Sequence, residues 1–100
     1  MVKVLVLYNQ PINKWEFEQY YQNVHIPLAK RIPNLTGLEI HRVLQTHHTN
    51  NKLYLVAELQ FEDQQKLKEG MDSPEGQAAQ EDVLNLLPFL ENPPVIMTVE

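Results

Sequence analysis

The sequence contains no cysteine, which excludes a disulfide framework, a thiolate nucleophile and a thiolate metal site. Cations are also few. Only 8 lysines and arginines stand against 13 aspartates and glutamates, for a net charge of −5, and they are scattered along the chain. Because nucleic acids and anionic membranes attract clustered cations, neither is expected as a partner.

Long hydrophobic runs are absent as well. No stretch approaches the roughly 18 to 20 apolar residues that a membrane helix needs, and the short apolar run at the N-terminus has neither the length nor the cleavage site of a signal peptide. Hydrophobic residues still make up 43% of the 100 residues, which is typical of a globular protein. We therefore expect one domain over residues 1–100, located in the cytoplasm.

Hydrophobic periodicity predicts four strands. Val2–Tyr8 and Leu53–Phe61 are largely apolar on both of their alternating faces, as is typical of central strands covered on two sides. Thr36–Thr46 alternates with more polar residues and suits an edge strand, and Val95–Glu100 forms the last strand. The two central strands are therefore expected to be the first and the third.

Capping residues predict where the helices begin. Asn13 followed by Glu16 is a variant of the capping box, and Asp63 precedes a second helical segment. Ser73 followed by Pro74 is a strong signal for a further start. The resulting order, βαββαβ, predicts an α+β domain with a ferredoxin-like antiparallel sheet and its helices on one face.

The other face of this sheet lacks a cover. Four strands of about six residues, about 4.8 Å apart and rising about 3.3 Å per residue, give a face on the order of 400 Å². That area is at the upper range of what a soluble monomer leaves exposed. We therefore expect a homodimer in which two sheets pack face to face about a two-fold axis.

The segment around His25 carries the candidate chemistry. On a helical wheel His25 lies about 40° from Tyr21, at the margin of the apolar stripe. Pro27 disfavours helical geometry at Ile26, so the helix is expected to end or kink there. His25 and Tyr21 can form an acid–base pair in an apolar pocket. Alternatively, His25 caps the last carbonyls and Tyr21 is core, an interpretation that the spacing alone favours.

Three further residues are candidates for binding a small molecule. Asp82 lies close to the apolar stripe of the last helix without being part of it, and is expected either in solvent or at the pocket rim. Tyr8 and Tyr54 lie on the two central strands, where either face could meet the helices.

Neither a metal nor a cofactor is expected. His47 and His48 are adjacent in a predicted turn, and we identify no carboxylate at ligand spacing beside them or beside His41. Glycine-rich phosphate loops, nucleophile elbows and paired-carboxylate motifs are absent too.

The chain resembles the EthD family of small dimeric α/β-barrel proteins. The resemblance covers nearly the whole sequence and rests on VLYNQP, FEQYYQNVHIPLAKRIP, LYLVAELQF and SPEGQAAQED. Its most specific part is the tyrosine-x-x-x-histidine-x-proline-leucine segment that begins at Tyr21. Asn34 stands where glycine would be expected after the proline, but asparagine tolerates the left-handed conformation, so the turn is expected to survive.

The resemblance implies a barrel dimer with a pocket in each subunit, and roles for Tyr21, His25 and Asp82. Members are often labelled reductases, and the family name comes from a protein required for fuel-ether breakdown. Related domains are cofactor-free decarboxylases, dehydratases or cyclases.

We therefore expect an enzyme of catabolic or secondary metabolism that acts on a small, partly apolar organic compound by acid–base chemistry. In this prediction His25 moves a proton and Tyr21 orients it, in a decarboxylase-, dehydratase- or isomerase-type reaction. The alternative is a non-catalytic ligand-binding or accessory protein of an oxidative degradation system.

Overall fold

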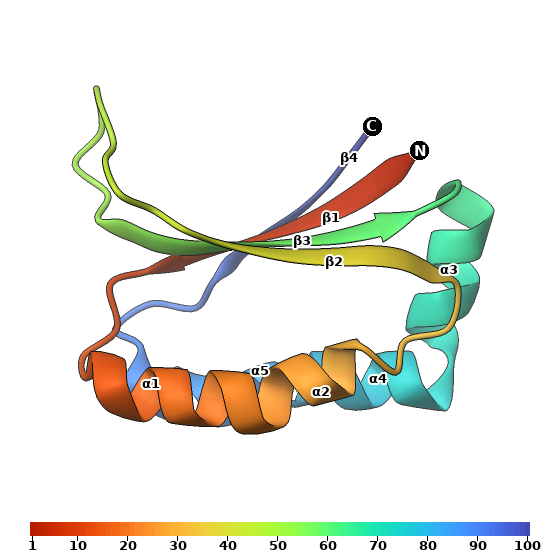
Figure 1. Cartoon of the computed structure of the whole chain (residues 1–100), viewed down its shortest axis with the longest axis horizontal. Coiled ribbons are helices and arrows are strands. Elements are labelled where there is room, and N and C mark those ends of the chain that lie inside the picture. Colours follow the sequence, from red (N-terminus) through yellow and green to blue (C-terminus); the bar gives the residue numbers. More distant parts are fainter.

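Four segments of alternating apolar residues pair into one antiparallel sheet, as the computed structural model of all residues 1–100 shows (Figure 1). The strands are β1 (Val2–Asn9), β2 (Leu35–Arg42), β3 (Leu53–Phe61) and β4 (Val95–Val99). Their order in the sheet is β2-β3-β1-β4. The predicted α+β class is therefore confirmed, with the two most apolar strands in the centre.

The first helical region consists of α1 (Lys14–Tyr20), a π-helical turn η1 (Tyr21–His25) and α2 (Ile26–Ala29). The second consists of α3 (Gln64–Asp72), α4 (Pro74–Glu81), α5 (Val83–Leu86) and a short 3₁₀ turn η2 (Leu87–Phe89). The helices α1, α2, α4 and α5 lie on one face of the sheet, and α3 connects the end of the sheet to that layer (Figure 1). None of these helices is long and apolar enough to span a membrane.

The three predicted N-caps are in place. The side chains of Asn13, Asp63 and Ser73 each accept a hydrogen bond from the backbone N–H three residues later, at 3.0, 2.8 and 3.0 Å. Each bond satisfies a donor that the first helical turn leaves free. Asn34 has a φ of 69°, so the turn before β2 adopts the left-handed conformation that was expected there.

Of the two outcomes expected from Pro27, an end or a kink of the helix at Ile26, the end does not occur, and the regular α-helix is instead interrupted by the π turn directly before Ile26. Ile26 has helical dihedral angles (φ −59°, ψ −46°), and its N–H bonds the carbonyl of Tyr21, five residues earlier. Pro27 has no N–H to donate and would crowd the carbonyl four residues before it in a regular α-helix. The wider π turn accommodates this proline. The helix α2, which contains Pro27, begins at Ile26 directly after the π turn.

The register of the sheet determines which side chains meet the helices. Val4 pairs with Leu59 and Tyr8 with Leu55, and all four are buried beneath the helices in the main core. The intervening residues of β1, among them Leu5 and Leu7, point to the face without helices. The helices therefore cover the face that carries Tyr8.

Candidate functional site

The π turn directs His25 inward. Buried residues recur every four positions along the first helical region, at Phe17, Tyr21, His25 and Ala29. In an α-helix a spacing of four drifts by about 40° per step, and the extra residue of the π turn counteracts this drift. Val24, one position before His25, is 38% exposed, whereas the ring of His25 stacks on Tyr21 with 5.4 Å between centroids.

His25 is paired with Asp82, which lies at the junction of α4 and α5. Nδ1 of His25 is 2.8 Å from Oδ2 of Asp82, and the two residues are 9% and 6% exposed. Asp82 is thus not in solvent, and it reaches the pocket through His25, which lines it. The ring bonds a carboxylate rather than the main-chain carbonyl that a capping histidine would bond.

Two other side chains hold the carboxylate in place. The hydroxyl of Tyr20 donates to Oδ1 of Asp82 at 2.6 Å, and the amide of Asn85 donates to the same oxygen at 2.9 Å. Burial by itself would raise the pKa of Asp82, but the hydrogen bonds from Asn85, Tyr20 and His25 together outweigh it and lower the pKa. Asp82 is therefore ionised near neutral pH.

This arrangement selects one tautomer of the imidazole. An ionised carboxylate only accepts, so Nδ1 of His25 donates to Asp82, and in the neutral ring Nε2 is left as an acceptor. Nε2 has no hydrogen-bond partner in the protein, and it is not sealed away from solvent. His25 therefore offers a free basic nitrogen.

His25 lines a pocket between the sheet and the helices. Its volume is about 120 Å³, and 15 of the 17 residues that line it are hydrophobic. The remaining two are His25 and Gln80. Ile96 on β4 also lines the pocket and is 57% exposed, so the pocket reaches the protein surface.

Tyr8 and Tyr21 line the same pocket. Burial raises the pKa of both well above the ordinary tyrosine value, and for Tyr8 the neighbouring Tyr21 adds to the effect. Both hydroxyls therefore remain protonated and serve as hydrogen-bond donors, not as bases. The structure thus brings together four of the five predicted site residues, namely Tyr8, Tyr21, His25 and Asp82.

Tyr54 belongs to a different cluster and does not line the pocket. A bulge in β3 leaves Tyr54 without a partner, because Tyr8 pairs with Leu55 and Asn9 with Leu53. Its hydroxyl donates to Glu18, which also accepts two hydrogen bonds from Arg42, at 2.6 and 3.0 Å. Arg42, with a smaller contribution from Tyr54, lowers the pKa of Glu18 to about 2. This cluster ties α1 to the ends of β2 and β3.

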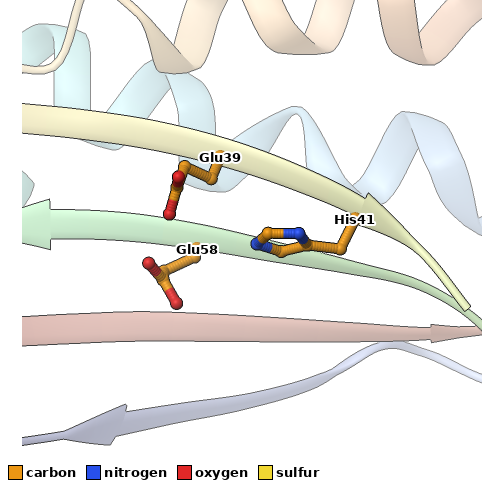
Figure 2. Close-up of side chains that lie close together, drawn as sticks. All are labelled: Glu39, His41 and Glu58. Atoms are coloured by element: carbon orange, nitrogen blue, oxygen red, sulfur yellow. The ribbon is translucent and has the colours of Figure 1, made fainter.

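A third polar group lies on the sheet face without helices (Figure 2). Glu39 and Glu58 are directly opposite each other on β2 and β3, and His41 points toward them from two residues further along β2. Their ligand atoms lie within 4.8 Å of one another, so these are the residues that could hold a metal ion. The prediction that no carboxylate lies at ligand spacing from His41 is therefore wrong, since residues two apart on a strand share a face. Gln60 donates to both glutamates.

Sequence reasoning missed Tyr20 and Asn85. The bond from Tyr20 to Asp82 spans 62 positions, and no local pattern reveals such a contact. Asn85 carried a weak local signal, because it follows Asp82 by three residues on a predicted helix, a spacing that brings two side chains together.

Comparison with known proteins places these features in one family. The profile of the EthD domain matches residues 9–88. An uncharacterised 11.0 kDa protein of the thcB–thcC intergenic region of Rhodococcus erythropolis is 31% identical over 85 residues, which cover 85% of this chain and 82% of that protein.

Solved structures agree with this assignment. A crystal structure of an ethyl tert-butyl ether D (EthD) family protein from Bacillus halodurans is 32% identical, covers 100% of this chain and 97% of its own, and has a TM-score of 0.88. A dimeric ferredoxin-like protein of unknown function from Jannaschia sp. CCS1 is 14% identical, covers 100% of this chain and 99% of its own, and has a TM-score of 0.68, a likeness of fold alone. On its match to the domain profile and to these two relatives of more than 30% identity, the chain belongs to the EthD family.

Proposed function

We propose that this protein is an enzyme in which His25 acts as a general base on a small, partly apolar organic compound. The observation that carries the proposal is that His25 lines an apolar pocket with its Nδ1 held by a buried carboxylate and its Nε2 free of any partner in the protein. A base needs this combination of a fixed tautomer and access to substrate. Proton transfer of this kind typically accelerates a reaction by about 10² to 10⁴.

Each of the neighbouring groups has a distinct role in this mechanism. Asp82 orients the imidazole and stabilises the imidazolium that forms when Nε2 takes a proton. The protonated hydroxyls of Tyr8 and Tyr21 are donors for a substrate oxygen on which negative charge develops. Negative charge on such an oxygen is common to isomerase-, dehydratase- and decarboxylase-type reactions. In the first two a base creates it by removing a proton from carbon, and in the third the loss of CO₂ creates it and an acid then returns a proton to carbon. None of these steps needs a redox partner, so these classes suit the pocket better than the reductase label of the family.

Replacing His25 with alanine tests the proposal. A nitrobenzisoxazole is a suitable probe, because a base removes its carbon-bound proton while the N–O bond breaks, giving a coloured nitrophenolate without any other reactant. We expect His25→Ala to lower kcat/KM for this reaction by about 10² or more, since the only free basic nitrogen in the pocket is lost. His47→Ala, in an exposed loop, is the matched control and should leave the rate unchanged.

Equal rates for the wild type and His25→Ala would contradict the catalytic role. If the variant then still bound small apolar molecules with wild-type affinity, the protein would instead be the ligand-binding or accessory protein, since the apolar pocket alone serves that function.

The same proposal includes a homodimer. The sheet face without helices is largely apolar along β1 and β4, where the outward residues are Leu5, Leu7, Val95, Met97, Val99 and, at the start of β1, Lys3, which pairs with Glu58. Val95 and Met97 are 58% and 40% exposed, which leaves a continuous apolar surface. The Jannaschia neighbour is described as dimeric. A second copy packed on this face would remove the surface from water.

Sedimentation measures this association. The wild type is expected to be a dimer at micromolar concentration, and Leu7→Lys should shift it toward the monomer because a charge would be buried in the interface. Leu84→Lys, an equally drastic change at a 67% exposed leucine on the helical side, is the control and should remain dimeric. A monomeric wild type would refute the dimer without affecting the roles of His25 and Asp82.

A further inference from the structure

The pocket beside His25 has a size, a charge and a hydrogen-bonding pattern that together restrict what it binds. We propose that it selects neutral compounds with a single compact ring that carries one hydrogen-bond donor, such as a phenol, and that it rejects carboxylates and phosphates of the same size. This inference rests on the proposed function in using the same pocket, but it concerns binding and is tested without turnover.

The size of the pocket limits the enclosed part of the ligand to one ring. An apolar cavity of about 150 Å³ holds a benzene molecule. The pocket has about 120 Å³ and connects to the surface near Ile96, so a single ring fills it and any larger substituent must project outward. Ala57 on β3 and Ala79 on α4 are both buried and both line this space. Their small side chains leave room for the ring.

The charges around the pocket exclude anions. No lysine or arginine is among the lining residues, and the single imidazole is already paired with ionised Asp82. A carboxylate or phosphate inside would therefore be buried without a cation and close to another negative charge, which is strongly unfavourable. A neutral ligand has no such cost.

The polar atoms of the pocket specify one donor on the ligand. Nε2 of His25 is an acceptor because Nδ1 donates to Asp82, so the ligand must supply a hydrogen to it. The hydroxyls of Tyr8 and Tyr21 line the same pocket and can donate to an oxygen. A ring hydroxyl serves both purposes, since it donates one hydrogen bond and accepts others.

Binding of phenol, toluene and benzoate, three single-ring compounds of similar size, tests the proposal by calorimetry or NMR titration near neutral pH. Phenol should bind best. Toluene should bind about tenfold more weakly because it lacks the hydrogen bond to Nε2, and benzoate at least about 100-fold more weakly because of its charge. Benzoate affinity within threefold of phenol, or no binding of phenol at all, would overturn the inference.

Two neighbouring alanines of α4 provide a matched pair that locates the binding. Ala79→Leu fills the pocket and should abolish phenol binding, whereas Ala78→Leu, at an exposed position, should leave it within about twofold of the wild type. Should Ala79→Leu fail to fold, Ala57→Val makes the same test with a smaller change on β3. Unchanged phenol binding in the folded pocket variants would place the ligand elsewhere and refute the assignment.

The two proposals fail separately. Phenol selectivity with no effect of His25→Ala on proton transfer would reject the enzyme and keep the ligand class. If proton transfer depended on His25 but benzoate bound as tightly as phenol, the enzyme would be kept and the ligand class rejected.

Discussion

Asp82→Asn is expected to lower kcat/KM for proton transfer from the benzisoxazole probe by about 10² to 10⁴, although the substitution removes no group that touches the substrate. The cause is the tautomer of His25. Tyr20 and Asn85 both donate to Oδ1 of Asp82, so the oxygen of the new amide is held in that place and its NH₂ group faces His25. Nδ1 must then accept, the ring proton moves to Nε2, and the base is lost.

The ¹⁵N chemical shifts of the His25 ring report which ring nitrogen carries the proton. They would not change if Asp82 had only a structural role. They should report a proton on Nδ1 in the wild type and on Nε2 in Asp82→Asn. Asn85→Ala is the control, because it removes one support of the carboxylate but keeps the tautomer, and its rate should fall by less than about tenfold. A wild-type rate and an unchanged tautomer in Asp82→Asn would show that Asp82 does not position the base.

Gly76→Ala is expected to lower the free energy of unfolding by about 3 kcal/mol, the upper range for overpacking. A Cβ at Gly76 would lie 2.1 Å from the carbonyl oxygen of Gly70 and 2.7 Å from the Cα of Met71, both backbone atoms where α4 crosses the end of α3. Helix propensity alone predicts the opposite sign, since alanine stabilises a helix interior by about 0.5 to 1 kcal/mol relative to glycine.

Urea denaturation distinguishes these two expectations. Gly37→Ala is the matched control, because its new Cβ would meet only the side chain of Gln60, which can rotate away. Its free energy of unfolding should therefore change by less than about 1 kcal/mol. If Gly76→Ala proved more stable than the wild type, the close crossing of α3 and α4 would be incorrect.

Local patterns in the sequence were sufficient for the fold. The two-sided apolar character of Val2–Tyr8 and Leu53–Phe61 predicted the central strands, and Asn13, Asp63 and Ser73 predicted the helix starts. These features depend on residues within a few positions of one another, which is why spacing alone reveals them.

The site depends on contacts that spacing does not encode. His25 and Asp82 are 57 positions apart, and their pairing follows from how the two helical regions pack on the sheet. Tyr54 lies apart from the pocket because its hydroxyl bonds Glu18 on α1, a residue 36 positions away, and the alternation of one strand does not reveal such a contact. Glu39 and His41 share a face within one strand and could have been recognised, whereas the approach of Glu58 required the register of β2 against β3.

The π turn also makes this protein sensitive to chain length at one particular place. Between Tyr21 and His25 the helix contains one residue more than regular α-geometry would hold. Loss of a single amino acid here would let the turn close into regular α-geometry, in which the ring of Pro27 would crowd the carbonyl four residues before it. His25 would also lose the position that the π turn gives it beside Tyr21 and Asp82. Related chains that retain this chemistry should therefore vary in length around residues 44–51 but not around residues 21–25.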